Sequence, residues 1–284
     1  MNNFNLRILR TTFTKALEDK LQFAQLANNS FSGEINQKND VVKMLQVGDI
    51  DISDYADGTD ISWQDLTDTQ LEIIADQDKS FSYALDTLEY NNQKTGILGE
   101  AARKAAYQVN KTVDSALAAL YASCLLTNTT YTDASPLNMN SLNIEDAVLD
   151  MTERFADAGI DRDIRKTMVV PPWFSSKMAL AGISSKTDNS ALYSSGYLTT
   201  ALGWDFIESN NVSIGTASTG AQTRIMCLVP GQSLGFAGAV SHIASTEIEL
   251  QIGKTGVKGR YVYGKKVVRP DMSGTIYADK TAEA

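Results

Sequence analysis

A long alanine-rich stretch, residues 96–126, constrains the fold more than any other feature of this chain. Its apolar and alanine residues recur every three or four positions, which is the pattern of one amphipathic helix. These positions are Leu98, Ala101, Ala102, Ala105, Val109, Val113, Ala116, Leu117, Leu120 and Leu125. Such a helix would be roughly 40 Å long, which is longer than a compact domain normally needs. The sequence therefore predicts an elongated unit organised along a single helix.

A second folded unit is predicted over residues 141–235. Asn143 can cap a helix whose first turn is acidic and whose end is marked by Gly159. The segment Thr167–Val170 is typical of a strand, two prolines and a short helix follow it, and Arg224–Val229 is typical of a second buried strand. Strands and helices that mix without a repeat indicate an α+β fold.

The first 75 residues carry too few periodic apolar residues to bury a core of their own. Residues 1–31 suggest an arm with one short helix that ends at a polar break after Ala27. The following excursion has turn residues at positions 54–58 and two possible strands, one around Val41 and one around Ile50. We expect both segments to become ordered against other parts of an assembly.

Charge is distributed unevenly along the chain. Residues 32–90 contain fourteen acidic side chains and three lysines, whereas residues 251–270 contain six basic side chains and no acid. Either these are solvated faces, or they are complementary surfaces that meet between copies of the chain. Under the second alternative, the candidate contact residues are Asp49, Asp51 and Asp54 on the acidic side and Arg260, Lys265 and Lys266 on the basic side.

Catalytic and metal chemistry have little support in the residues. The only histidine is His242, whereas nucleophilic triads and zinc sites normally use histidine. Cys124 and Cys227 have no CxxC or Cys/His spacing, and the acidic run from Asp49 to Asp60 lacks the residue order of an EF-hand. We therefore predict no catalytic, cofactor or metal site.

Composition also limits the partners of this chain. A net charge of −9 argues against non-specific binding to nucleic acid by the whole molecule, because such binding depends on clustered Lys and Arg. The N-terminus lacks the apolar core of a signal peptide, and no stretch reaches the roughly 18 apolar residues of a membrane span. We expect DNA, where present, to be enclosed rather than bound, and we expect no membrane partner.

Three short segments resemble one family. They are VVPPW at residues 169–173, WDFIESNN at residues 204–211 after a Gly203-Trp204 turn, and YVYGKKVVRPD at residues 261–271, where a strand pair around Gly264 is predicted. With the order of the predicted elements, they resemble the major capsid protein of tailed bacteriophages, an α+β HK97-like capsid fold. The resemblance implies five parts. These are an N-terminal arm (1–31), an extended β loop (32–75), a peripheral domain with a long spine helix (76–140), an axial domain (141–235), and C-terminal strands that return to the peripheral domain (236–284).

The resemblance also implies a function. Hexamers and pentamers of such a protein assemble in the host cytoplasm into an icosahedral virion shell around phage double-stranded DNA, with a portal and a separate scaffold protein as partners. The alternatives are an encapsulin-type nanocompartment shell protein and, from another class, an α+β hydrolase or binding module.

The resemblance makes Trp204 a candidate contact between subunits. Loops at Gly203-Trp204 and at residues 209–220 would meet around the axes of the capsomers. The alternative is that Trp204 packs in the core of its own domain, as large aromatic side chains usually do.

Overall fold

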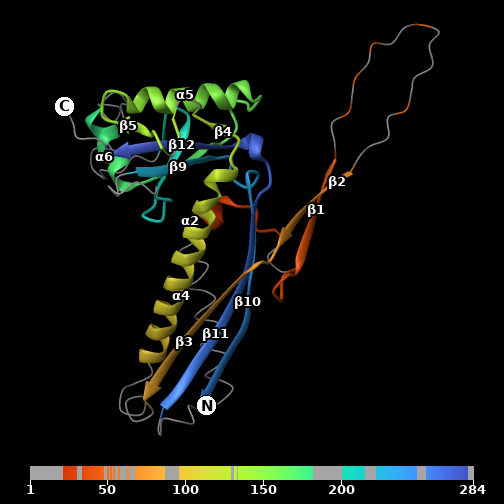
Figure 1. The fold of residues 1–284 in the computed structure, drawn as a ribbon, viewed down its shortest axis with the longest axis vertical. Helices are drawn as coiled ribbons and strands as arrows, with labels where there is room; N and C mark the ends of the chain where they lie inside the picture. Colours follow the sequence, from red (N-terminus) through yellow and green to blue (C-terminus); the bar gives the residue numbers. More distant parts are fainter. Residues whose placement is uncertain are drawn as a thin grey trace.

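Two sheets and one long helix organise the computed structural model of this chain (Figure 1). The structure describes residues 22–30, 34–47, 50, 52, 54, 57, 63, 68–86, 96–128, 131–132, 134–181, 200–214, 222–247 and 254–280.

The long helix α4 spans Gly96–Ala118, and its 23 residues give it a length of about 34 Å. Its buried side is formed by Ala102, Ala106, Val109, Val113 and Leu117, as the periodic pattern predicts. The helix ends eight residues earlier than predicted, and a short 3₁₀ helix, η1 (Ala119–Ser123), follows it. The reason is tertiary, because the amide of Leu125 donates to the carbonyl oxygen of Pro270 (3.2 Å) and the chain turns into a strand, β4 (Leu126–Thr127).

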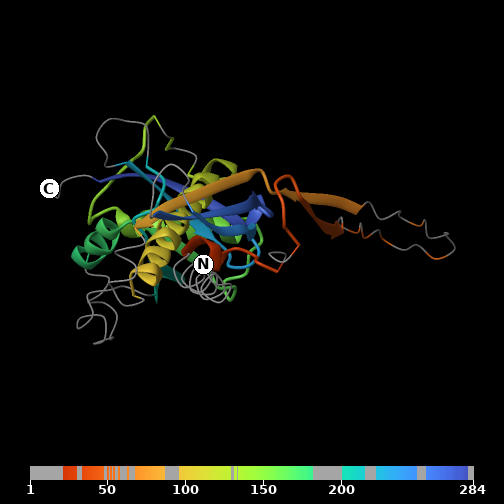
Figure 2. The same ribbon diagram turned by 90° about the horizontal axis from the view of Figure 1, so that it is seen from below.

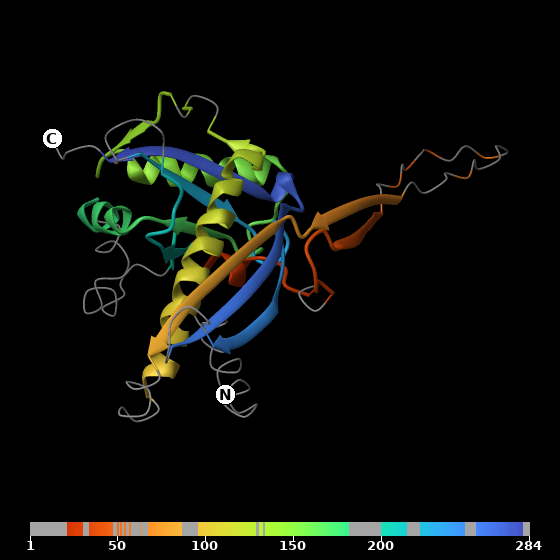
Figure 3. The ribbon, with the colours of Figure 1, turned by 60° about the horizontal axis from the view of Figure 1, so that its bottom comes forward.

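A three-stranded antiparallel sheet runs beside α4 (Figures 1 and 3). Its strands, in the order β10-β11-β3, are β10 (Leu234–Glu247), β11 (Lys254–Val267) and β3 (Gln77–Asp86). The predicted strand pair around Gly264 is wrong, since Gly264 lies inside the continuous strand β11. A Cβ atom at Gly264 would lie 2.5 Å from the carbonyl oxygen of Ile74, so glycine is needed there for close backbone approach rather than for a turn.

The second sheet has seven strands in the order β4-β12-β9-β6-β8-β7, with β5 paired to β12. Two helices, α5 and α6, belong to this part of the molecule (Figure 1). Element bounds beyond β4 are β5 (Leu137–Met139), α5 (Ile144–Asp157), β6 (Thr167–Val170), α6 (Pro172–Leu180), β7 (Thr200–Ala201), β8 (Trp204–Glu208), β9 (Gln222–Leu228), the 3₁₀ helix η2 (Pro270–Met272) and β12 (Ser273–Lys280). The C-terminal strands were expected to return together to the sheet beside the long helix. Only β10 and β11 do so, whereas β12 joins the seven-stranded sheet beside β9.

Both faces of the seven-stranded sheet are covered. Along β9, Ile225 and Cys227 belong to the core beneath α5 and α6, whereas Met226 and Leu228 belong to the core shared with α4. Every residue of β9 is buried for this reason, and its second half, residues 225–228, is a continuous apolar run.

The helix α5 has the buried face and the glycine end that its local sequence predicts. The buried residues of α5 include Ala147, Val148, Met151 and Phe155, and Gly159 follows the helix end with φ +80°. The amide of Ile160 donates to Phe155 and that of Gly159 to Ala156, a Schellman arrangement. Asn143 precedes the helix without a side-chain cap, because its amide group bonds the backbone of Asn138 and Asn140 instead.

The turn before Trp204 lies one residue earlier than predicted. Leu202 (φ 54°) and Gly203 (φ 81°) are its two central residues, and both have positive φ, as a two-residue type I′ hairpin turn requires. Ala201 and Trp204 therefore pair across it, and Trp204 begins β8.

The extended loop is a hairpin that projects from the body of the molecule (Figures 1 and 2). Strand β1 (Val41–Val47) pairs antiparallel with β2 (Asp68–Ile74), and the base of the hairpin packs through Val42 and Ile73 onto the three-stranded sheet. The first strand is confirmed, but the second is not at Ile50 and Ile52, whose side chains are 67% and 98% exposed.

One helix of the arm is described, α2 (Gln22–Leu26). Its Phe23 and Ala24 are buried in the core that includes α4. The remainder of the arm's predicted helix, including Phe13 and Leu17, lies outside the described residues.

Candidate functional site

Three basic side chains of β11, those of Arg260, Lys265 and Lys266, have partners inside their own subunit. The Nε of Arg260 lies 2.8 and 2.9 Å from the two carboxylate oxygens of Asp78 on β3, and a terminal guanidinium nitrogen also donates to this carboxylate. This hydrogen bonding lowers the pKa of Asp78. Arg260 therefore ties β11 to its neighbouring strand.

Lys265 and Lys266 hold other elements against the same strand. The ammonium group of Lys265 donates to the carbonyl oxygen of Ala116 in the last turn of α4, where a cation is favoured by the helix dipole. Burial lowers the pKa of Lys265. The ammonium group of Lys266, on an exposed residue, donates to the carbonyl oxygen of Glu72 on β2 (3.2 Å). Part of the basic charge therefore stabilises the subunit itself.

The acidic candidates are placed only in part. Asp54 is exposed, and Asp49 and Asp51 lie outside the described residues. A contact between these aspartates and the basic strand of another copy therefore stays a prediction. Lys266 is its best-placed basic member, because it is exposed and bonds only a neutral carbonyl oxygen, whereas Arg260 is paired with a carboxylate and Lys265 is half-buried.

Trp204 lies in the core of its own subunit and its side chain is fully buried. Its indole N–H donates to the hydroxyl of Thr152 on α5 (2.8 Å), and its ring meets that of Phe155 edge to face, with centroids 5.0 Å apart. The structure therefore places Trp204 as the core alternative had it, and we no longer propose it as a contact residue.

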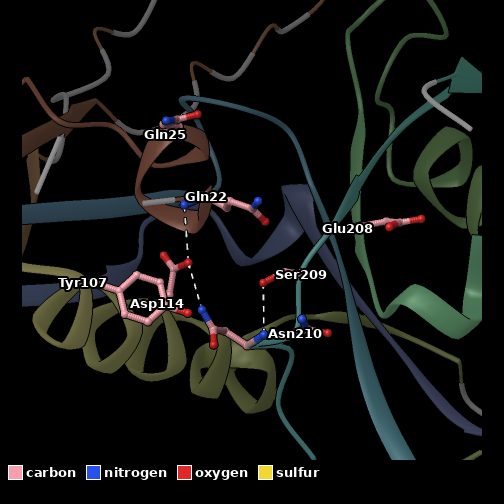
Figure 4. Close-up of a pocket in the computed structure, with 8 residues that line it drawn as sticks. Gln22, Gln25, Tyr107, Asp114, Glu208, Ser209 and Asn210 are labelled. Atoms are coloured by element: carbon pink, nitrogen blue, oxygen red, sulfur yellow. Dashed lines mark hydrogen bonds between the residues drawn. The ribbon is translucent and has the colours of Figure 1, made fainter. Parts of the chain in front are cut away.

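A polar pocket of about 460 Å³ lies where the arm, the long helix and the seven-stranded sheet meet (Figure 4). At its centre, Asp114 of α4 accepts hydrogen bonds from the amides of Phe23 (3.3 Å) and Gln22 (3.4 Å) of α2, and from the side-chain amide of Asn211 after β8 (3.4 Å). The pocket is lined by Gln22, Gln25, Tyr107, Asp114, Glu208, Ser209, Asn210 and Asn211. One carboxylate thus connects three parts of the chain.

Asp114 is a buried acid with no basic side chain among the residues that line its pocket. Asp114 is 2% exposed, and burial raises its pKa against the smaller opposing effect of its three hydrogen bonds. This group was not predicted from the sequence. Its signal was a pair of polar residues, Asn110 and Asp114, four positions apart on a helix and next to the apolar positions Val109 and Val113.

The histidine and the two cysteines are not among the residues that line this pocket. His242 is exposed on β10, and burial raises the pKa of the thiols of Cys124 and Cys227, which disfavours the reactive thiolate. Within the described ranges, no group of three or more His, Cys, Asp or Glu residues is placed to hold a metal ion. No helix in the described part of the chain is long and apolar enough to cross a membrane.

Comparison with known sequences gives one family. Residues 47–272 match the model of a family described as phage capsid protein. No curated protein sequence matches the chain.

Solved structures share the fold. A protein from Mycobacterium phage Che8 is 19% identical, with 90% of this chain and 91% of that chain covered and a TM-score of 0.70. The capsid structure of the cyanophage P-SCSP1u gives 15% identity, 92% and 89% coverage and a TM-score of 0.69. A virus-like particle from Pyrococcus furiosus gives 11% identity, 95% and 98% coverage and a TM-score of 0.55. The architecture of two sheets, one long helix and a projecting hairpin therefore belongs to a fold found in phage capsids.

Proposed function

The chain belongs to the phage capsid protein family, and from that premise we propose that it is the major coat protein of an icosahedral phage head. The observation that carries the proposal is the family match, which covers residues 47–272. It includes the three-stranded sheet, the seven-stranded sheet except β12, the long helix and strand β2 of the projecting hairpin. In this function, many copies close into a shell, and no catalytic group is required.

The shape of the subunit supports self-assembly. The β1–β2 hairpin projects from the rest of its subunit (Figure 2). A two-stranded ribbon is only marginally stable by itself in water. Its exposed surface includes large apolar side chains, among them Ile52 and Trp63. A neighbouring copy would bury these residues and stabilise the ribbon.

We assign the parts of the subunit as follows. The long helix α4 and the β10-β11-β3 sheet form the peripheral domain, and the seven-stranded sheet with α5 and α6 forms the axial domain. Because β12 pairs with β9, residues 273–280 go with the axial domain rather than with the peripheral domain. Residues 1–31 remain the arm and residues 32–75 the extended loop.

The partners follow from a shell with these properties. Copies of the chain would assemble into hexamers and pentamers in the host cytoplasm, with a separate scaffold protein and a portal. With a net charge of −9, the shell would enclose double-stranded DNA rather than bind it tightly.

An encapsulin-type compartment is the alternative within the same fold, and the family match does not favour it. No observation favours the hydrolase or binding-module alternative. The test is to isolate particles from infected cells that produce this protein, image them by electron microscopy, and measure nuclease-protected DNA. Heads containing protected double-stranded DNA are the expected result, whereas particles that hold an enzyme and no DNA would contradict the proposal.

A further inference from the structure

The polar pocket between α2, α4 and the segment after β8 contains a buried carboxylate with weakly placed partners (Figure 4). The side chain of Asp114 is buried, and its three hydrogen bonds are long, at 3.3–3.4 Å. Hydrogen bonds from N–H groups to oxygen are normally about 2.7–3.2 Å long. The carboxylate of Asp114 can therefore accept a shorter and stronger hydrogen bond from a further group.

Gln22 adds a second acceptor to the same pocket. Its side-chain oxygen is buried and has no hydrogen-bond partner within the described residues. Figure 4 shows the side-chain amide of Gln22 on the side of α2 that faces Ser209. Because buried polar groups nearly always have partners, this oxygen indicates an occupant that donates hydrogen bonds.

The charge of the pocket is negative. Asp114 and Glu208 are the only charged residues among those that line it. A buried charge without a counter-charge is unfavourable, so the pocket favours a positively charged occupant. Tyr107 also lines the pocket, and the face of an aromatic ring attracts cations. The occupant that fits is therefore a cation with N–H donors.

A metal ion fits these residues less well than an organic cation. Calcium takes about 6–8 oxygen ligands, several of them from carboxylates. This pocket has two carboxylates, and Figure 4 shows that of Glu208 pointing away from Asp114. Both oxygens of Asp114 already accept from amide groups, whose N–H dipoles repel a metal ion. The volume of about 460 Å³ also lies in the range of small-molecule sites, roughly 300–1,000 Å³.

We propose that this pocket binds an ammonium group, which donates to the carboxylate of Asp114 and to the side-chain oxygen of Gln22. An ammonium group has three N–H donors and can serve both acceptors at once. Its source is either a free alkylamine or a lysine of residues 1–21, and Lys20 lies two positions before Gln22. In both cases the bound group ties α2 of the arm to the long helix. One subunit forms the whole pocket, so this inference does not depend on the proposed function.

Urea unfolding of the dissociated full-length chain tests the site. The midpoint is measured with increasing butylammonium chloride at about pH 8, above the usual pKa range of carboxylates. A ligand that binds only the native state multiplies the folding equilibrium constant by 1 + [L]/Kd, so a concentration of ten times Kd should raise it about 11-fold. The matched probe is tetramethylammonium chloride, which has the same charge and no N–H donor. It should stabilise the chain no more than sodium chloride does.

Three variants assign the gain to this pocket. Asp114→Asn removes the charge and Gln22→Met removes the unpaired oxygen, so each should reduce or abolish the gain. Glu153→Gln removes an exposed carboxylate of α5 outside the pocket and should keep the full gain. Gln22→Met leaves Asp114 in place, so the test remains usable if Asp114→Asn does not fold. A gain that both pocket variants retain in full would overturn the inference.

Replacing both Lys15 and Lys20 by glutamine separates the two sources of the ammonium group. If the ligand is a free amine, butylammonium should stabilise the unmodified chain and the double variant equally. If a lysine fills the pocket, the double variant should be less stable than the unmodified chain, this loss should vanish when Asp114→Asn is also present, and butylammonium should stabilise only the double variant. Either result supports the inference. Both chains failing to respond to butylammonium, or responding equally to tetramethylammonium, would overturn it.

Discussion

Replacing Trp204 by alanine should destabilise the subunit rather than its contacts with other copies. The side chain is fully buried against Phe155, and its indole N–H has one partner, the hydroxyl of Thr152. Truncation removes the ring, leaves a cavity beneath α5 and deletes the hydrogen bond. These effects act on the core of the seven-stranded sheet.

The size of the effect follows from the contacts. Removing a buried Trp side chain costs about 3–5 kcal/mol, of which the edge-to-face pair with Phe155 accounts for about 0.5–1.5 kcal/mol. Trp204→Phe keeps much of the ring packing, so its cost should be smaller. Thr152→Val keeps the ring but leaves the indole N–H unpaired, at a cost of about 1–3 kcal/mol. A domain is stable by only about 5–15 kcal/mol, so the alanine variant should be marginal.

Urea unfolding of dissociated subunits, followed by circular dichroism, measures these differences. The expected order of stability is unmodified chain, then Trp204→Phe, then Trp204→Ala. The Thr152→Val variant is the control that keeps the ring and removes the hydrogen bond of the indole N–H, together with the bond from the Thr152 hydroxyl to the carbonyl oxygen of Val148 (2.9 Å). An unfolding midpoint for Trp204→Ala equal to that of the unmodified chain, together with a loss of capsomers, would refute this reasoning and restore the contact hypothesis.

Three further outcomes are expected. Gly264→Ala should destabilise the subunit, because the added Cβ would lie 2.5 Å from the carbonyl oxygen of Ile74. At Gly99 on α4 an added Cβ has no atom within 4 Å, so Gly99→Ala should stabilise the subunit by up to about 1 kcal/mol in the same unfolding assay. Burial raises the pKa of Asp114 in the native subunit, so the native state keeps this proton to higher pH than the unfolded chain does. The free energy of unfolding should therefore fall, relative to that of the non-titrating Asp114→Asn, as the pH rises from about 4 through the native pKa. A difference in unfolding free energy between the two chains that does not depend on pH would contradict this. Lys266→Glu should slow assembly at low salt and Asp54→Lys should partly restore it, as followed by light scattering; normal assembly of Lys266→Glu with the fold intact would show that these charges are solvated faces.

Short-range patterns in the sequence were enough for the helices and for several strands. The apolar spacing of α4 and the buried face of α5 depend on residues three or four positions apart, and the Gly159 end of α5 depends on one residue with positive φ. The strands β6 and β9 were visible as short apolar runs. These features depend on residues close together in the chain, so they could be predicted without the fold, and the family resemblance rested on their order.

Tertiary structure decided which strands pair and what the polar groups contact. The placement of β12 beside β9, the end of α4 at Ala118 and the burial of Trp204 each depend on partners that no local spacing identifies. Lys266 shows how far apart in the sequence such partners can be, since it donates to the carbonyl oxygen of Glu72, 194 positions away. Hydrogen bonding and burial act between groups that meet only after the chain has folded. The sequence could therefore predict a charged or aromatic residue, but only the folded subunit determined whether that residue is free for another copy.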